Sequence, residues 1–254
     1  KEPMGKAQEQ QLEEYLKQVL PQVKGVVLSD YGSGTITDKL LGQIFAYCQE
    51  HNIPTIVDSR YDILRFKTVD YIKQNDAELS AAIGRDLATE EELVQGGCEL
   101  LVKMSAKGAL ITRGEDGMSL FQIISPQEAA DYLKSQEVSG SGEAGQFREG
   151  LTVKLVVKRQ TGRLSVVQEL ISYQDRDILV SHIPVTDKSE VYDVSGAGDT
   201  CVATVILGLA AGLEPLLACQ LSNEASGIAV RKMGTSVVYA RELEARFRQL
   251  GYEA

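Results

Sequence analysis

The chain has 254 residues, of which 43% are hydrophobic and 24% are charged, an ordinary composition for a globular protein with a sizeable core. Its formal net charge of −10 argues against nucleic-acid binding, since the sequence contains no local basic patch that could offset it. No apolar run has the length of a membrane span, and no signal-peptide pattern follows the charged first residues. We therefore expect a cytoplasmic protein that binds neither membranes nor nucleic acids.

Cysteine and histidine usage argues against a disulfide framework and against a structural zinc site. The histidines, His51 and His182, lie far apart in the sequence, and neither has a metal-type partner nearby. The four cysteines are scattered through apolar segments without a C-x-x-C spacing, as expected for reduced core thiols: Cys48, Cys98, Cys201 and Cys219.

Helical periodicity alternates with short apolar runs along most of the chain. Strands that alternate with helices predict an α/β fold, namely a doubly wound, mostly parallel sheet with helices on both faces. In chain order, the patterns predict a helix at 9–20, a strand at 25–30, a helix at 38–50, strands at 54–58 and 69–73, a helix at 90–104, a strand at 109–113, and helices at 198–212, 215–232 and 240–249.

Residues 123–183 break this alternation. A short helix at 127–134 leads into "SGSGEAG" (139–145), which has the composition of a flexible linker. Two β-type runs then flank Gln160-Thr161-Gly162 and predict a β-hairpin. We interpret 123–183 as an insertion that divides a core formed by 1–122 and 184–254. It could be a flap, an oligomer contact or a surface excursion without a function.

Polar residues follow five of the predicted strands, counting a β-type run at Val191 and Tyr192. Ligands of open parallel sheets bind beyond the carboxyl ends of the strands, so these polar residues predict a binding site at one rim. The five segments are "SDYGSG" (29–34), "DSR" (58–60), Asn75 with Glu78, "TRGEDG" (112–117) and "GAGD" (196–199).

The stretch "GAGD" combines an anion-binding turn with a carboxylate. Backbone amides of Gly196, Ala197 and Gly198, at the start of a helix, can stabilise negative charge. Asp199 carries the same sign as a phosphate, so it suits a general base that takes a proton from an attacking hydroxyl. Asp199 could equally be a helix cap, and the local sequence leaves both alternatives open.

Four ordered motifs resemble those of the ribokinase-like (PfkB) carbohydrate kinases. "DVSGAGD" (193–199) resembles the D-T-x-G-A-G-D signature of that family, and Asn75-Asp76-Ala77-Glu78 its N-x-x-E element. "TRGEDG" is similar to its T-x-G-x-x-G nucleotide turn, and "SNEASGIAVRKMGT" (222–235) to its C-terminal nucleotide-site helix. "VVLSDYGSGTIT" and "VYDVSGAGDT" resemble the branch that phosphorylates the anomeric position of a heptose 7-phosphate in ADP-heptose synthesis.

This resemblance implies ATP as phosphoryl donor, a sugar or sugar phosphate as acceptor, and Mg²⁺. Asp199 would be the base, and the amides of Gly196, Ala197 and Gly198 would form the anion hole. The implied binding residues are Asn75 and Glu78 for Mg²⁺ through water, Thr112, Gly114, Gly117 and Asn223 for the nucleotide, Asp30, Tyr31 and Arg60 for the sugar or a phosphate, and Asp193 and Ser236 for a monovalent cation such as K⁺.

Structural alternatives stand beside these roles. Glu78 could be a helix-surface acid, Asn223 a helix-surface amide, and Arg60 a solvated arginine. Asp193 and Ser236 could cap turns, and residues 112–117 could simply connect a β-hairpin.

The chain departs from the family pattern in its sugar-binding half. We expect it to lack the family's opening strands, much of the sugar pocket and the lid strands. It also has Ser33 where heptose-type kinases carry lysine, and Gln74 where a proline usually precedes the asparagine. Two functions follow. The first is a sugar kinase whose missing parts come from a homodimer neighbour, a partner chain or an N-terminal segment outside this sequence. The second is a nucleotide-binding remnant or scaffold without phosphoryl transfer.

Overall fold

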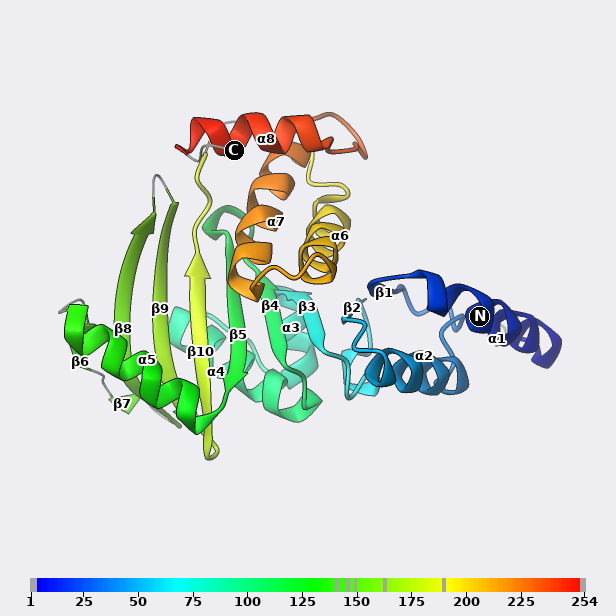
Figure 1. Cartoon of the computed structure of the whole chain (residues 1–254), viewed down its shortest axis with the longest axis horizontal. Coiled ribbons are helices and arrows are strands. Elements are labelled where there is room, and N and C mark those ends of the chain that lie inside the picture. Colours follow the sequence, from blue (N-terminus) through cyan, green and yellow to red (C-terminus); the bar gives the residue numbers. More distant parts are fainter. Residues whose placement is uncertain are drawn as a thin grey trace.

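One mixed sheet runs through the whole molecule (Figure 1). The computed structural model describes residues 4–139, 142–144, 147–148, 150–161, 164–188 and 191–251. The sheet has ten strands in the order β1-β2-β3-β4-β5-β10-β9-β8-β6, and β7 pairs with β8 beside this path.

The first four strands form the parallel half of the sheet, in which β1 pairs with β2, β2 with β3, and β3 with β4. Their carboxyl ends therefore meet at one edge, as the α/β prediction requires. The elements of this half are α1 (Lys6–Val19), η1 (Leu20–Gln22), β1 (Val26–Asp30), α2 (Asp38–Glu50), β2 (Thr55–Ser59), η2 (Ile63–Arg65), β3 (Tyr71–Asn75), α3 (Asp76–Ile83), α4 (Glu90–Met104) and β4 (Gly108–Thr112).

The second half of the sheet is antiparallel, so the sheet is mixed, and the prediction of a mostly parallel sheet is wrong in this respect. β5 (Met118–Ile124) pairs antiparallel with β4 and with β10 (Arg176–Ile183). The predicted hairpin is confirmed, since β8 (Leu151–Thr161) pairs antiparallel with β9 (Leu164–Tyr173). The remaining elements here are η3 (Gly114–Asp116), α5 (Pro126–Ser139), β6 (Gly142–Ala144) and β7 (Phe147–Arg148).

Residues 123–183 thus extend the common sheet. β9 pairs with β10, which continues the sheet from β5, and the side chains of Ile171 and Ile178 are fully buried in the same core as α4. Of the linker predicted at 139–145, residues 140, 141 and 145 lie outside the described residues, and 142–144 form β6.

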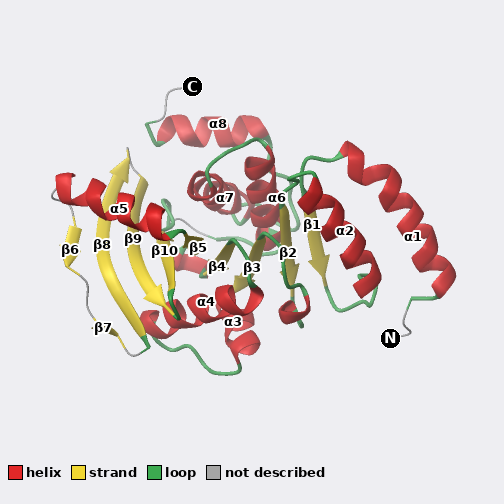
Figure 2. Cartoon of the chain, turned by 60° about the horizontal axis from the view of Figure 1, so that its bottom comes forward, coloured by secondary structure: helices red, strands yellow, loops and turns green. Residues whose placement is uncertain are grey.

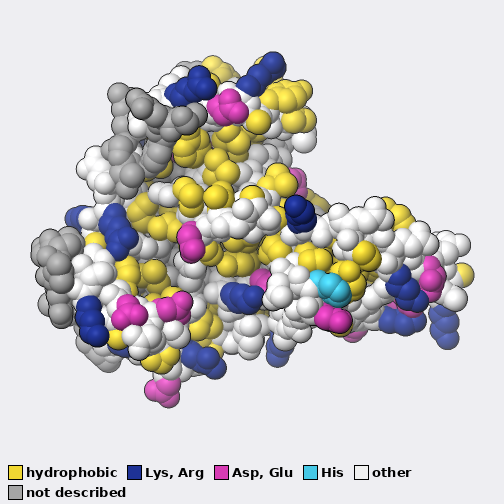
Figure 3. All heavy atoms as spheres, viewed as in Figure 1, with side chains coloured by type: hydrophobic (Ala, Val, Ile, Leu, Met, Phe, Trp, Pro, Cys, Tyr) yellow, Lys and Arg dark blue, Asp and Glu magenta, His cyan; other side chains and the backbone are white. Residues whose placement is uncertain are grey.

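Helices cover both faces of the sheet, and each face has its own hydrophobic core (Figure 2). One core joins α2, α3 and α4 to the sheet, and the other joins α6 (Ala197–Ala210) and α7 (Pro215–Ala229) to it. α8 (Ala240–Gln249) follows α7. The four cysteines are free and buried. Apolar side chains also gather on the surface over α6 and α7 (Figure 3), where Leu207 and Leu217 are exposed.

The helices begin and end where the local sequence dictates. Thr37 caps α2 by accepting a hydrogen bond from the Leu40 amide, and Thr89 forms a capping box with Glu92 at the start of α4. Gly97 lets α4 lie directly on the sheet, because a Cβ there would sit 2.3 Å from the Phe121 ring. In the described part of the chain, no helix has the length and apolarity needed to cross a membrane.

The strand predicted immediately before α6 is not formed. Residues 191–194 have no regular secondary structure, and Val191, Tyr192 and Val194 are exposed. The backbone amides of Tyr192 and Asp193 donate to the Val230 carbonyl at the end of α7, so they take part in no strand ladder. β-type side chains alone do not make a strand where no neighbouring strand accepts the backbone bonds.

Candidate active site

The Gly-Ala-Gly turn starts α6 in a backbone conformation that favours glycine. Gly196 has φ of 78° and is the N-cap of α6, and Ala197 and Gly198 are the first two helical residues. Ser226 of α7 donates to the Ala197 carbonyl at 3.3 Å, which ties the turn to the neighbouring helix. The Ala197 amide donates to the Val194 carbonyl at 3.2 Å, whereas the Gly198 amide, next in the first turn of α6, has no partner within the helix and can receive an anion.

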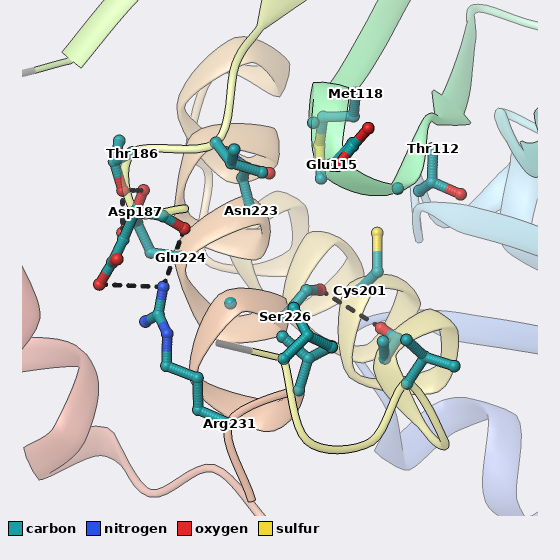
Figure 4. A pocket seen from close by; sticks show the side chains of 18 of the residues that line it. Thr112, Glu115, Met118, Thr186, Asp187, Cys201, Asn223, Glu224, Ser226 and Arg231 are labelled. Carbon is teal, nitrogen blue, oxygen red and sulfur yellow. Dashed lines mark hydrogen bonds and ion pairs between the residues drawn. The ribbon is translucent and has the colours of Figure 1, made fainter. Parts of the chain in front are cut away.

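A pocket of about 450 Å³ lies beside this turn (Figure 4). Thr112, Glu115 and Met118 lie on one side of it, and Asn223 and Ser226 of α7 lie on another. Six of the predicted site residues line this pocket, although they come from three distant parts of the sequence: Thr112, Gly114, Gly117, Ala197, Gly198 and Asn223.

Residues 112–117 form both a β-hairpin connection and one wall of this pocket. They join β4 to antiparallel β5, and the Arg113 amide donates to the Gly117 carbonyl at 2.8 Å. Gly117 has φ of 85°, and a Cβ on it would lie 2.1 Å from the Ile183 carbonyl oxygen. The turn is therefore wedged against the end of β10, which only glycine at this position allows.

Asn223 is buried in the pocket wall, so the alternative of a helix-surface amide is wrong. Its exposed fraction is 7%, and its Nδ2 donates to the Pro184 carbonyl at 2.9 Å. Beside it, the buried carboxylate of Glu224 accepts from the Thr186 hydroxyl and from Arg246 of α8. Arg231 points toward Asp187 from the end of α7 (Figure 4) and pairs with that carboxylate at 3.0 Å.

Asp199 lies on the other side of the Gly-Ala-Gly turn, at the rim of the parallel strands. Its side chain is exposed, and the Tyr31 hydroxyl, just beyond β1, donates to its Oδ1 at 3.3 Å. The negative charge of Asp199 raises the pKa of Tyr31 above its usual value. Since the N-cap of α6 is Gly196, Asp199 stands inside the first turn of the helix with its carboxylate toward Tyr31.

A buried ion pair that the sequence analysis missed lies beneath the same turn. Asp58 and Lys73 are register partners on β2 and β3, and their side chains pair at 3.0 Å. Burial lowers the pKa of Lys73, but Asp58 and Glu78 outweigh this effect and raise it, so the ammonium stays charged. Burial raises the pKa of Asp58 against the opposing effect of Lys73, and the charges of Glu78 and Asp199 raise it further.

Within this turn, Gly198 lies between the pocket and the rim. Gly198 lines the pocket, and a Cβ built on it would lie 3.1 Å from Lys73 Nζ and 4.0 Å from Asp58 Oδ2. The only sequence signal for Lys73 is a lysine at the end of the apolar strand "VDYIK".

Asn75 and Glu78 have a structural role at the start of α3. Asn75 Oδ1 accepts from the Glu78 amide at 2.7 Å, and Glu78 Oε2 accepts from the Asn75 amide at 2.8 Å, which is a complete capping box. Among the residues that the structure describes, no group of three or more His, Cys, Asp or Glu side chains forms a metal-type cluster. Both side chains thus cap α3, and the magnesium role that the family resemblance implies for them stays a prediction.

The remaining predicted residues lie at the end of β1 (Asp30), after β2 (Arg60), before α6 (Asp193) and after α7 (Ser236). Asp30 is buried and accepts from the Gly32 amide and the Ser59 hydroxyl, whereas Arg60 is exposed nearby. Asp193 accepts from the amides of Ser195 and Gly234, which lowers the pKa of its carboxyl. It thus caps a turn as the structural alternative proposed, and it ties the loop before α6 to residues 233–236. Ser236 donates to the Ala229 carbonyl at 3.4 Å.

A pocket at the carboxyl edge of a partly parallel sheet is typical of the α/β proteins that bind nucleotides. The model of the pfkB family of carbohydrate kinases matches residues 2–139 and 170–240 of this chain. The chain belongs to this family. The gap between the two matched stretches, residues 140–169, lies within the segment 123–183.

Curated relatives and solved structures agree with this membership. The chain is 31% identical over 250 residues to the bifunctional protein HldE of Hyphomonas neptunium, and 30% identical over 228 residues to that of Rhodospirillum rubrum. These matches cover 98% and 89% of this chain but only 40% and 35% of the two relatives.

Two solved structures show the same fold. Phosphofructokinase-2 from Escherichia coli, in complex with potassium, has a TM-score of 0.60 at 19% identity, with coverage of 98% of this chain and 64% of that one. Arabidopsis thaliana ribokinase, complexed with ribose and ATP, has a TM-score of 0.59 at 16% identity, with coverage of 100% and 61%.

Proposed function

We propose that the protein catalyses ATP-dependent phosphorylation of a sugar or sugar-phosphate hydroxyl, with heptose 7-phosphate as the first acceptor to test. The observation that carries this proposal is the position of Gly198, which lines the pocket on one side and adjoins the carboxylate rim on the other. A nucleotide in the pocket would direct its terminal phosphate toward the amides of Gly196–Gly198, and an alcohol at the rim would meet Asp199. The HldE relatives favour a heptose acceptor.

In the proposed reaction, the acceptor oxygen forms a bond to the γ-phosphorus of ATP while the bond from that phosphorus to the β–γ bridging oxygen breaks. ADP leaves, and the Asp199 carboxylate takes the proton of the hydroxyl. Exposure of Asp199 and its contact with Tyr31 support this role, because the carboxylate stands where an acceptor can reach it. Mg²⁺, held through water by Asn75 and Glu78, would supply charge neutralisation at the phosphates.

Three further assignments belong to this proposal. Asp193 and Ser236 would lie beside a monovalent cation, as suggested by the potassium complex of the Escherichia coli structure. A second copy of the chain or a partner would close the sugar side of the rim. Four free, buried cysteines fit a reducing compartment such as the cytoplasm.

The test compares wild type with Asp199→Asn in an assay of ATP consumption, using heptose 7-phosphate and a panel of hexoses. General-base catalysis contributes roughly 10²–10⁴-fold, so we expect kcat to fall at least about a hundredfold while ATP still raises the melting temperature. Asp131→Asn, an exposed carboxylate on α5, is the control and should leave the rate unchanged. Equal sugar-dependent rates for wild type and Asp199→Asn would refute the base assignment. Binding of ATP without any turnover in wild type would establish the alternative of a nucleotide-binding scaffold.

A further inference from the structure

Lys73 is a charged residue in an unusual place. It is 5% exposed, and it is the one buried lysine or arginine among the residues that the structure describes. Burial of an ammonium group is costly unless a partner compensates it. The compensation is the Asp58 carboxylate at 3.0 Å, which is itself largely buried.

The position of this pair along the strands gives it access to the proposed chemistry. Lys73 lies two residues before the end of β3, and Asp58 one residue before the end of β2, so both side chains are at the carboxyl edge of the parallel strands. They lie on the face covered by α6, since Tyr71, two residues before Lys73 on the same strand, packs against the α6 core. Lys73 Nζ therefore stands directly under Gly198.

The charges around Lys73 are otherwise negative. Asp58, Glu78 and Asp199 interact electrostatically within this group of side chains. A phosphoryl group brought to the turn would lie near the carboxylates of Asp58 and Asp199, and these repel an anion unless a cation lies among them. A structural salt bridge alone would not need this location, since replacing a buried ion pair with apolar residues is often neutral or stabilising.

We propose that Lys73 is a further catalytic residue, whose ammonium group faces the phosphoryl group during its transfer at the Gly196–Gly198 turn, and that Asp58 holds this ammonium group in place before the substrates bind. This inference rests on the proposed function and deepens it. Lys73 forms no covalent bond. It stabilises negative charge on the phosphoryl oxygens while the transfer between ADP and the acceptor alcohol takes place.

The test separates the charge of Lys73 from its structural pairing. Lys73→Met removes the cation but leaves Asp58 unpaired, whereas the double variant Asp58→Asn/Lys73→Met removes both charges and keeps a neutral pair of similar size. Lys107→Met is the control. Lys107 pairs with Asp70 at 2.8 Å just before β4 and β3 begin, which is the edge of the sheet opposite to the rim. The kcat, the KM for ATP and the melting temperature are measured for all four proteins.

Loss of one group that stabilises transition-state charge costs about 10²–10³-fold in kcat, so we expect at least a hundredfold loss in both Lys73 variants. The KM for ATP should stay within about threefold of wild type, and Lys107→Met should turn over normally. If Lys73→Met fails to fold, the double variant alone decides the question, because it buries no unpaired charge.

Two results would overturn the inference and leave the proposed function standing. The first is a double variant that regains the wild-type rate, since Lys73 would then serve only to neutralise Asp58. The second is a Lys73→Met enzyme that turns over like wild type. Absence of sugar-dependent turnover in wild type, with every acceptor of the panel, would refute the proposed function and this inference together.

Discussion

Two glycines of one turn should respond very differently to the same substitution. Gly117 has φ of 85° and ψ of −121°, a region that essentially only glycine occupies, at a cost of about 1–3 kcal/mol for other residues. The new Cβ would also meet the Ile183 carbonyl oxygen at 2.1 Å and the Pro184 backbone at 2.9 Å, so the backbone of residues 183–184 must move. Such overpacking costs about 1–3 kcal/mol more. We therefore expect Gly117→Ala to destabilise the protein by about 4 kcal/mol.

Gly114→Ala is the matched control. Gly114 has φ of 54°, in the ordinary left-handed region, and a Cβ there would meet nothing within 4 Å. Its substitution should cost about 1 kcal/mol, the usual penalty of that region for alanine. Urea unfolding of the two variants measures the difference, which corresponds to melting temperatures lowered by about 12 °C and about 3 °C.

Gly117→Ala should also affect the nucleotide pocket. The Pro184 carbonyl accepts the hydrogen bond from Asn223, so a displaced Pro184 should disturb that side chain and weaken ATP binding in Gly117→Ala more than in Gly114→Ala. Equal stability losses in the two variants would refute the reasoning, because both the backbone conformation and the clash with residues 183–184 set Gly117 apart from Gly114.

Two further variants test the charges and the burial around the site. Arg246→Met should destabilise the protein by about 3 kcal/mol, because it leaves the buried Glu224 carboxylate without its arginine, and Arg246→Met/Glu224→Gln should recover most of this loss in urea unfolding; no recovery would contradict the pairing. Tyr71 has its pKa raised by burial, and further by Asp70, to about 12. A folded pKa above the unfolded value means that this contribution to stability is complete below the unfolded pKa and is lost as the pH rises toward 12. The stability advantage of wild type over Tyr71→Phe should therefore shrink by about 1 kcal/mol between about pH 9 and pH 11, and a pH-independent difference would contradict the assignment.

The elements predicted best are those whose ends are encoded locally. The helices expected at 38–50 and 90–104 are found with these bounds, because Thr37 and Thr89 cap them and their apolar periodicity continues to the last turn. The strands of the parallel half were also predicted, since β1 to β4 are short apolar runs between turn residues, whereas β5 and β10 were not predicted.

Strand direction and strand formation are decided by distant partners. β5 runs antiparallel to β4 because a tight turn at 113–117 joins them, yet the residues of β5 would suit either direction. Val191 and Tyr192 have the side chains of a strand, but the amides of Tyr192 and Asp193 donate to the carbonyl of Val230, almost forty positions later. No local pattern contains that information.

The residues of the candidate site also differ in whether the local sequence predicts them. Residues that act through their own backbone, such as Gly196 and Gly117, leave a sequence signal, because a positive φ favours glycine. A pair such as Asp58 and Lys73 leaves none, because it depends on the register between two strands, and a shift by one residue would turn the lysine to the face covered by α4. Lys73 lies beneath Gly198 for two reasons. β2 and β3 pair in this register, and α6 begins directly above them.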